Sequence, residues 1–304
     1  MTKRKANLSL IFVTALWGVS FYFARLGIED LGILSLNAYR FLFAFIFLCV
    51  FSIRKITKIN FVTLKYSILS GIPVVLAYLS YSFGIVNTSL SNAAFLCCLA
   101  VLFTPIFSYF FNNIVPNKKL IFSLVICIPG IALITLNDSF VLSNGDLFCI
   151  LCAALYALTI IIMEKGVNTI DVDPYNLAAF QLGFVGLCYL LLTFIFEGPI
   201  LPSSSNTIIV VAALAILCTA ITTVIQSIAQ KYTTATNVGL IFTLEPIFAS
   251  IASYFLANEV MTANQILGAL IIISSIIILE VRWSETKIYE IIFYRTKNAT
   301  TREW

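Results

Sequence analysis

Glu245 is the residue of this sequence with the clearest potential for chemistry, because it stands within the apolar stretch LIFTLEPIFAS at residues 240–250. Counted from Asn237, where the surrounding apolar run begins, it lies about 12 Å along a helix axis. In a hydrocarbon layer about 30 Å thick, that depth is close to the middle. An ionisable group there is costly and is expected to face other helices or a water-filled cavity. We therefore expect Glu245 to bind a substrate ammonium group or a coupling proton, or else to form a structural ion pair.

Arg40 is the natural partner of Glu245, since it also lies within an apolar segment. Three roles are open for it. In an ion pair with Glu245, each charge would lower the cost of burying the other. Alternatively, the guanidinium group is suited to bind a substrate carboxylate through two parallel hydrogen bonds. The third role is structural: the long side chain extends to the outer membrane interface, with Asn37 as its neighbour.

Several aromatic residues fall deep inside apolar segments. Trp17 and Tyr156 lie near the middle of theirs, where anchoring at the membrane interface does not explain them. Tyr78 and Tyr81 are three residues apart, which puts them on one face of a helix. Rings with polar tips can line a cavity for an amphipathic ligand or a cation. Ordinary packing is the alternative for each of them, and Trp17 is the one we assign most firmly to a cavity.

Amide side chains complete the set of polar residues at depth. Gln181 and Gln226 are deep enough to line a cavity. Asn92 is a weaker candidate for substrate contact. Together with Asn237 it lies near the start of one of two matching helices, where capping or a hydrogen bond between spans is the simpler role.

Two prolines interrupt apolar segments. Pro246 cannot donate an amide hydrogen, and its ring crowds the carbonyl of Phe242, while Pro105 does the same to Val101. An offset of 145 residues pairs the two segments but not the two prolines, so we expect kinks one turn apart. Kinks of this kind suit gating, although a packing kink is the alternative.

Several kinds of chemistry are excluded by composition. The chain has no histidine, which removes His-ligated zinc and Ser-His-Asp catalysis. It has no GxxxxGK[ST] loop for nucleotide hydrolysis. The cysteines all fall in apolar segments and are expected to be small packed hydrophobes; they are Cys49, Cys97, Cys98, Cys127, Cys149, Cys152, Cys188 and Cys218. We expect no enzyme activity, no metal and no cofactor.

The elements that must position these residues are membrane-spanning helices. Of the 304 residues, 61% are hydrophobic and only 11% charged, and the mean hydropathy is +1.02. A soluble core of this size cannot bury so much apolar side chain, whereas lipid accepts it. The net charge of +4 gives no nucleic-acid signal, because the basic residues cluster in short connections. Ten spans are predicted, at 8–26, 34–53, 63–84, 90–111, 119–137, 145–165, 174–196, 206–228, 236–257 and 263–281.

Span boundaries and orientation follow from local signals. Asp173 can cap the seventh span, and Pro174 suits its first helical position. Lysine and arginine predominate at one face of the membrane if both termini are cytoplasmic, which predicts that orientation. These residues are Lys3, Arg4, Lys5, Arg54, Lys55, Lys58, Lys65, Lys118, Lys119, Lys165, Lys231, Arg282, Lys287, Arg295, Lys297 and Arg302. The opposite loops carry mainly acidic residues.

The two halves of the chain resemble each other. The offset of 145 aligns Ser108-Tyr109-Phe110 with Ser253-Tyr254-Phe255, and an offset of 139 pairs Trp17 with Tyr156. Each half holds five predicted spans, so the second must enter the membrane upside down. The fold class expected is therefore all-α integral membrane, with two inverted five-helix repeats at 1–137 and 145–281 and a cytoplasmic tail at 282–304. Inverted repeats are a recurrent plan of secondary transporters.

Two stretches resemble a known family. SNAAFLCCLAVLFTPIFSYFF (91–111) and ATNVGLIFTLEPIFASIASYFLANE (235–259) are similar to the fourth and ninth spans of EamA-type transporters in the drug/metabolite transporter superfamily. ALWGVSF (15–21), AQKYT (229–233) and QILGALIIISSIIILE (265–280) fit the same pattern. The resemblance implies a ten-helix carrier of the bacterial cytoplasmic membrane with a central cavity. One departure is Asn112-Asn113, which stands where the second half has Asn258-Glu259.

The function expected is secondary transport with alternating access, in the form of export of small metabolites such as amino acids. Its driving force would be a proton gradient or the gradient of the substrate. A nucleotide-sugar or lipid-precursor carrier, or a drug exporter, is the alternative within the same fold. The expected partners are a small-molecule substrate and the lipid bilayer, with possible proton coupling and no nucleic acid. Monomer and homodimer both remain open.

Overall fold

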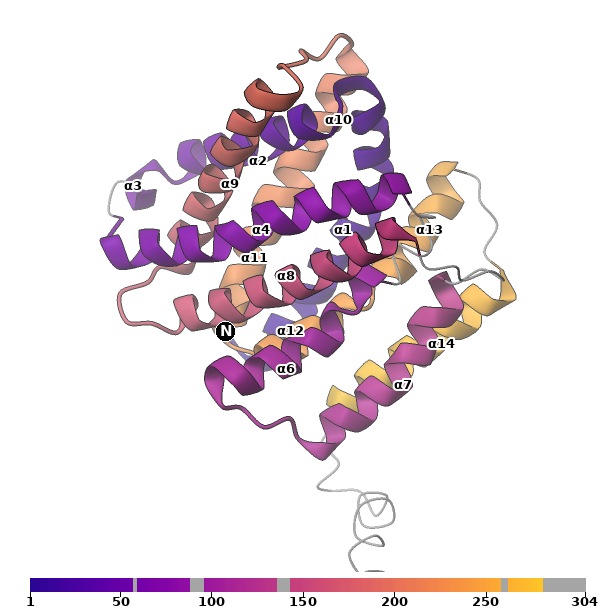
Figure 1. Ribbon diagram of the computed structural model, residues 1–304. Helices are drawn as coiled ribbons and strands as arrows, with labels where there is room; N and C mark the ends of the chain where they lie inside the picture. Colours follow the sequence, from indigo (N-terminus) through magenta and orange to yellow (C-terminus); the bar gives the residue numbers. More distant parts are fainter. Residues whose placement is uncertain (57–58, 88–95, 136–142, 258–261, 281–304) are drawn as a thin grey trace, which may run out of the picture.

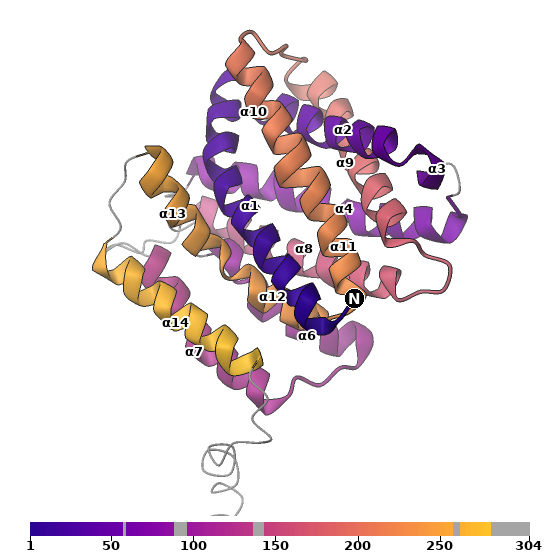
Figure 2. The same cartoon turned by 180° about the vertical axis from the view of Figure 1, so that it is seen from behind.

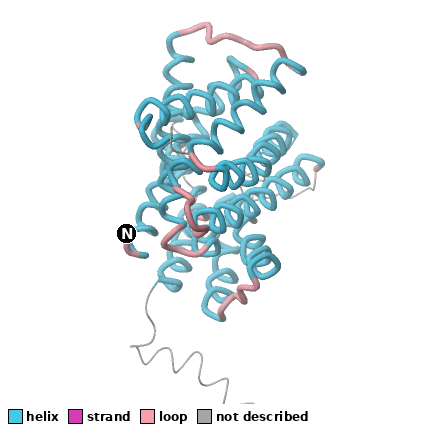
Figure 3. Tube along the Cα trace, turned by 90° about the vertical axis from the view of Figure 1, so that its left-hand side faces the viewer, coloured by secondary structure: helices cyan, strands magenta, loops and turns pink. Residues whose placement is uncertain are grey.

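The computed structural model describes residues 1–56, 59–87, 96–135, 143–257 and 262–280. Three sequence-based expectations fall outside these residues: Asn92, the acidic position Glu259, and the tail after Arg282. Figure 3 shows the described part as helices joined by short loops, with no strand in it. The helices are α1 (Lys3–Leu31), α2 (Ile33–Phe51), α3 (Ile53–Ile56), α4 (Phe61–Asn87), α6 (Ala100–Asn112), α7 (Lys118–Thr135), α8 (Asn144–Val167), α9 (Pro174–Phe196), α10 (Ser205–Ala215), η1 (Ile216–Ile221), α11 (Thr222–Gln230), α12 (Ala235–Phe242), α13 (Glu245–Ala257) and α14 (Ala263–Glu280).

The helices are long because backbone groups in a bilayer core must be hydrogen-bonded within the segment. Seven of the described stretches are long and apolar enough to cross a membrane: Lys3–Leu31, Ile33–Phe51, Phe61–Gly84, Asn144–Val167, Pro174–Phe196, Ser205–Gln230 and Ala235–Leu256. Leu96–Asn112 and Ile266–Ile278 are shorter apolar helices. The all-helical membrane fold is thereby confirmed, while the count of ten spans stays a prediction.

The boundaries follow local sequence signals. As predicted, the Asp173 side chain accepts a hydrogen bond from the Asn176 N–H at 2.9 Å, and α9 begins at Pro174. Helix α8 begins with a capping box, in which Ser143 and Asp146 each accept a backbone N–H of the other. The first helix is longer than predicted: α1 runs from Lys3 to Leu31, whereas the predicted span was 8–26.

The helices pack in pairs that repeat between the two halves of the chain. Helix α2 packs against α9, and α7 packs against α14, set to one side of the molecule in Figures 1 and 2. Helix α4 packs along α8, and the corresponding helices of the other half, α10–α11 and α1, also pack together. In the same way, α6 packs against α8, and its counterpart α12–α13 packs against α1. Figure 2 shows α1 between α10–α11 on one side and α12–α13 on the other. Each contact therefore has a counterpart in the other half.

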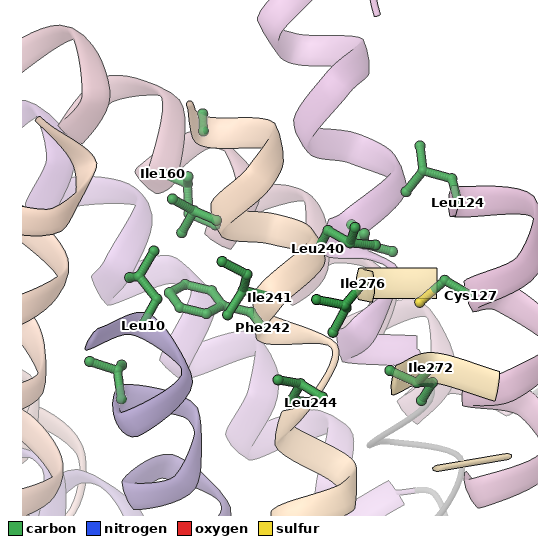
Figure 4. Close-up of a cluster of buried hydrophobic side chains, with 14 of the residues drawn as sticks. Leu10, Leu124, Cys127, Ile160, Leu240, Ile241, Phe242, Leu244, Ile272 and Ile276 are labelled. Atoms are coloured by element: carbon green, nitrogen blue, oxygen red, sulfur yellow. The ribbon is translucent and has the colours of Figure 1, made fainter. Parts of the chain in front are cut away.

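The two largest of five hydrophobic clusters among the described residues hold most of these helices together. The larger one contains side chains from α1, α6, α7, α8, α11, α12, α13 and α14. Figure 4 shows part of it, with Leu10, Phe242 and Leu244 among the labelled side chains. The second lies among α2, α4, α9, α10 and η1, around Phe41 and Tyr189. The cavity described below is lined by residues of both clusters, Trp17 from the first and Phe41 from the second.

The predicted fourth and ninth spans are both interrupted, at matching positions. Residues 96–98 are helical, Leu99 lies in a turn, and α6 begins at Ala100. In the second half α12 ends at Phe242 and α13 begins at Glu245. The Leu99 N–H donates to the Leu96 carbonyl, and the Leu99 carbonyl accepts from the N–H groups of Leu102 and Phe103. The residues 145 positions later make the same bonds. The Leu244 N–H donates to the Ile241 carbonyl, and the Leu244 carbonyl accepts from Ile247 and Phe248.

The expected proline kinks, one turn apart, stay a prediction, because these interruptions precede both prolines. The two interruptions fall at equivalent residues, and neither proline sets their position alone. Pro246 is the second residue of α13, a place that suits proline because its missing N–H would be unpaired there anyway. Pro105 stays inside α6.

Candidate functional site

A small cavity lies between the two halves of the chain. Its walls come from α1, α2, α4, α8, α9, η1 and α11, and the space within it that is open to the centre of a water molecule is about 30 Å³. The lining residues are Trp17, Phe41, Val74, Tyr78, Tyr156, Thr159, Met163, Gln181, Leu182, Cys218, Thr219, Thr223 and Gln226. Five candidates from the sequence therefore meet here: Trp17, Tyr78, Tyr156, Gln181 and Gln226.

One wall of the cavity is a π-helical turn. Helix η1 carries Cys218 and Thr219, and such turns widen a helix and are frequent at functional sites. The Cys218 carbonyl accepts hydrogen bonds from Trp17 Nε1 at 3.1 Å and Thr222 Oγ1 at 2.8 Å, and Arg40 Nη2 lies 3.5 Å from it. The sequence ILCTAI contains no glycine or proline that would indicate this turn. Cys218 and Thr219 were therefore not among the cavity residues predicted from the sequence.

Arg40 lies behind this wall and is only 5% exposed. Its Nε donates to Thr219 Oγ1 at 2.6 Å, and its guanidinium carbon lies 5.4 Å from the centre of the Tyr78 ring and 5.8 Å from that of Phe41. A cation over aromatic faces with a hydroxyl acceptor is stabilised away from water. Of the three roles left open for Arg40, extension to the interface is the one that this burial rules against, because its hydrogen-bond partners lie inside the protein.

The expected direct ion pair between Arg40 and Glu245 does not form. Among the described residues, the one ion pair within 4.0 Å joins Arg25 to Glu29 at 3.8 Å, on the surface. Arg40 and Glu245 are nevertheless close enough for their charges to interact through space. Each therefore keeps hydrogen-bonding capacity that a direct pair would consume.

Glu245 is the first residue of α13, at the interruption of the ninth predicted span, and it is half-buried. Within the described part of the chain, no hydrogen bond or ion pair reaches its carboxylate. Its charge also acts on Tyr78, Tyr81 and Tyr156. The positive end of the α13 dipole favours a carboxylate at this position. Glu245 thus lies near the cavity but outside its lining.

The aromatic candidates fall into three separate groups of ring contacts. Trp17 and Tyr156, which occupy matching positions of the two halves, meet edge to face at 5.9 Å. Trp17 also packs against Phe242, the last residue of α12, at 4.8 Å. Tyr78 packs on Phe41 at 5.1 Å. Tyr81 contacts Phe21 at 6.1 Å and does not line the cavity.

Two of the buried glutamines are joined by hydrogen bonds, whereas a third has an unpaired nitrogen. Gln226 Nε2 donates to Gln230 Oε1 at 3.3 Å, and Gln230 Nε2 donates to the Ile160 carbonyl at 2.9 Å, which links α11 to α8. Gln181 is 2% exposed, and its Nε2 finds no hydrogen-bond partner among the described residues. Asn237 does not cap α12, because the N-cap is Thr234; its Nδ2 donates to Thr233 Oγ1 at 3.3 Å.

Glu164 is a buried acidic residue that sequence reasoning passed over. It is 9% exposed, and its Oε1 accepts the Ala235 N–H at 2.9 Å, at the start of α12. Its Oε2 is buried without a partner in the part of the chain that the structure describes. The sequence did hold a signal for Glu164: it is an acidic residue at the inner end of a predicted span, where basic residues predominate.

The comparisons with known proteins place this architecture. The model of the EamA-like transporter family matches the chain twice, over residues 4–136 and 143–281. This chain belongs to the EamA-like transporter family. Its EamA relatives include an uncharacterized transporter of Archaeoglobus fulgidus, 24% identical over 284 residues, covering 91% of this chain and 86% of the relative. The uncharacterized transporter YoaV of Bacillus subtilis is 26% identical over 294 residues, covering 93% and 99%.

A solved structure, described only as a crystal structure of a protein, superposes with a TM-score of 0.77 at 14% identity. It covers 91% of this chain and 96% of its own, and at that identity it supports the fold alone. Family and relatives together identify a multi-pass membrane transporter of the EamA family in the drug/metabolite transporter superfamily, and they point away from an enzyme.

Proposed function

We propose that this EamA protein is a secondary transporter that exports small metabolites, amino acids first among them, by alternating access around the central cavity. The observation that carries the proposal is the cavity itself. Matching residues of the two halves, Trp17 and Tyr156, meet at its wall, and amide and hydroxyl groups share the lining with aromatic rings. Sites between repeats near the bilayer midplane are where secondary transporters bind substrate.

An inverted arrangement of the halves, 1–137 and 145–281, is part of this proposal. Support comes from the two matches of the family model, from helix contacts that recur in both halves, and from the equivalent interruptions at Leu99 and Leu244. The proposed setting is the cell membrane, with both termini on the cytoplasmic side and Arg282 at the start of a cytoplasmic tail.

Alternating access is the mechanism that we propose for this cavity. The cavity is small in the described arrangement of the helices, and the helices would separate to admit substrate. The interruptions at Leu99 and Thr243–Leu244 supply points where the halves of a span can change their angle, because the backbone there is not held by a continuous helical ladder. Pro105 and Pro246 lie just beyond these points and limit the hydrogen bonds that could rebuild the ladder.

Glu245 is the proposed coupling residue. Its carboxylate lies at the interruption, without a fixed partner among the described residues, and can take either a substrate ammonium group or a proton. Removing the charge with Glu245→Gln in proteoliposomes should reduce transport about tenfold or more, or remove its dependence on pH.

The matched control for that variant is Glu29→Gln, which changes an exposed carboxylate in a surface ion pair and should transport as the wild type does. If Glu245→Gln transports like the wild type at every pH, the coupling role is wrong.

A nucleotide-sugar or lipid-precursor carrier is the alternative within the fold. Such a carrier needs several basic groups to hold phosphates. Of the residues that the structure describes, Arg40 is the one buried lysine or arginine, which disfavours this alternative. A counterflow screen that includes amino acids, polyamines, nucleotide sugars and lipophilic drugs separates the candidates.

A further inference from the structure

Three cysteine thiols meet where the short helical piece before α6 lies against α8. Cys149 and Cys152 are three residues apart on α8, which places them on one face of that helix. The Cys97 Sγ lies 3.9 Å from the Cys149 carbonyl oxygen. The Cys97 thiol is also within hydrogen-bonding reach of the thiols of Cys149 and Cys152. All three cysteines are reduced, and they lie outside the lining of the cavity.

The three thiols differ in how far they are buried. Cys149 is fully buried, and a Cβ added at Gly84 of α4 would lie 2.5 Å from its Sγ, so the glycine leaves the space that this sulfur occupies. Leu96 and Cys149 form a small buried cluster, against which Cys97 and Leu99 pack. Cys97 itself is only half-buried. An oxidant therefore meets Cys97 first, with two further thiols beside it that can resolve an oxidised sulfur.

The thiols come from different halves of the chain. Residues 96–98 are helical and belong to the fourth predicted span, in the first half, whereas α8 is the first helix of the second half. Cys97 also lies two residues before Leu99, where the fourth predicted span is interrupted. A covalent bond from Cys97 to α8 would therefore join the two halves beside a point where the proposed transport cycle changes the angle of a span.

The depth of the thiols favours oxidation. In the proposed orientation, the fourth and sixth predicted spans both begin at the outer face of the membrane. Cys97 lies about 10 Å along a helix axis from the predicted start at residue 90, and Cys149 lies about 6 Å from the predicted start at residue 145. Disulfides persist on the outer side of a cell membrane, away from the reductants of the cytoplasm. A hydroperoxide carries no charge, so the hydrocarbon layer does not exclude it as it excludes an ion.

We propose that Cys97, Cys149 and Cys152 form an oxidation site, at which a hydroperoxide joins the two halves of the chain through a disulfide from Cys97 to α8. The site goes beyond the proposed function, because it adds a covalent control on the movement of the halves. In the reduced chain the halves are free to rock against each other, and in the oxidised chain they are fastened beside the interruption at Leu99.

The reaction takes two steps. The Cys97 sulfur attacks the terminal oxygen of the hydroperoxide, the O–O bond breaks, and the thiol proton passes to the oxygen that leaves as an alcohol, or as water when the oxidant is hydrogen peroxide. The sulfur of Cys149 or Cys152 then attacks the sulfenic acid at Cys97. The S–O bond breaks as the S–S bond forms, and the second thiol proton leaves with the hydroxyl group as water. Two thiols are oxidised to one disulfide, and the hydroperoxide is reduced to an alcohol and water.

Mass spectrometry of the purified full-length protein tests the site. The protein is treated with hydrogen peroxide, and its remaining thiols are alkylated with N-ethylmaleimide in denaturant. The reduced wild type should take up eight alkyl groups and the oxidised protein two fewer, and a thiol reductant should restore all eight. Tryptic cleavage after Lys118 and Lys119 separates Cys97 from the cysteines of α8. The two peptides should stay joined after oxidation until they are reduced.

Serine variants identify the sulfurs that react. Cys97→Ser should prevent the link, because it removes the half-buried thiol that meets the oxidant. Cys98→Ser is the matched control, since Cys98 is the next residue and is also half-buried, and it should form the link as the wild type does. Cys149→Ser and Cys152→Ser should together prevent the link, whereas each of them alone leaves one thiol of α8 to resolve the sulfenic acid.

Three results would overturn the oxidation site: eight alkyl groups after peroxide treatment, a loss of alkylation that no thiol reductant restores, or a link that persists in Cys97→Ser. The mass readout needs no transported solute, so it fails or succeeds independently of the proposed function. In proteoliposomes, peroxide should lower counterflow through the wild type about tenfold, because the halves can no longer rock. A reductant should restore the flux, and peroxide should leave Cys97→Ser unaffected. Equal flux before and after the link forms would remove the control on movement.

Discussion

Trp17 shows how one side chain can combine packing and polar roles at this site. Its ring contacts Tyr156 and Phe242, from helices of the second half, and its Nε1 donates to the Cys218 carbonyl of η1. Three helices of the second half thus meet at one residue of the first. A buried indole that satisfies its N–H in this way is both a hydrophobic contact and a fixed polar link.

Substitution of Trp17 should separate these two contributions. Trp17→Phe keeps much of the ring contact and removes the donor, and the free energy of unfolding should fall by about 1–2 kcal/mol. Trp17→Ala also leaves a cavity and should cost about 3–5 kcal/mol. Thermal unfolding in detergent, followed by size-exclusion chromatography, measures both.

Phe12→Ala is the matched control for Trp17, since Phe12 lies on the same helix and is 52% exposed. It should change the stability by less than either Trp17 variant. Equal losses for Trp17→Phe and Trp17→Ala would mean that the hydrogen bond to Cys218, and not the packing of the ring, makes the contribution.

At the scale of the elements, α12 is held to α8 at its first residue. The bond from the Ala235 N–H to Glu164 Oε1 supplies an acceptor that the start of a helix otherwise lacks, and the Gln230 to Ile160 bond lies one turn away along α8. A carboxylate at a helix N-terminus is also favoured by the helix dipole. These links fix the beginning of the interrupted ninth predicted span.

Glu164→Ala should loosen this junction. It leaves the buried Ala235 N–H without an acceptor, which costs about 1–3 kcal/mol, and amide hydrogen exchange at residues 235–240 should become faster. Glu164→Gln keeps an acceptor oxygen and serves as the control, with exchange close to that of the wild type. Slow exchange in Glu164→Ala would show that the bond does not hold the start of α12.

The elements also show what the sequence could predict and what it could not. The start of α9 was predictable because Asp173 and Pro174 are strong local signals, and the cavity candidates were predictable because polar residues are rare at depth. The π-helical turn was not predictable, because ILCTAI contains no glycine or proline that would mark it, and η1 is described only once its contacts with α1 and α2 are seen. The break in the ninth predicted span was only partly predictable: Pro246 pointed to the Phe242 carbonyl, where α12 ends, but not to the matching break at Leu99. A proline constrains the carbonyl four residues earlier, but where the helix ends depends on the neighbours that satisfy it.

At the scale of the molecule, repeated helix contacts connect sequence similarity to a transport cycle. Helices α2 and α9 pack together as equivalent members of the two halves, and so do α7 and α14. In the proposed inverted arrangement, contacts between equivalent helices lie on the axis that would relate the halves, and they can persist while other pairs rearrange. The tight approach of α1 to α13, where Gly18 lies against the backbone of Phe248 and Ala249, involves non-equivalent helices. Such contacts are the ones that rocking of one half against the other would change.

The proposed inverted arrangement predicts which loops face each side of the membrane. With both termini in the cytoplasm, Lys118, the first residue of α7, should lie inside and Ser203, just before α10, should lie outside, and both are exposed. In intact cells, a membrane-impermeant maleimide should label Ser203→Cys, while Lys118→Cys should be labelled only after permeabilisation. The wild type is the control, because its eight cysteines are buried or half-buried. The reverse pattern would place the termini outside, and labelling of both positions from one side would mean that the second half is not inverted.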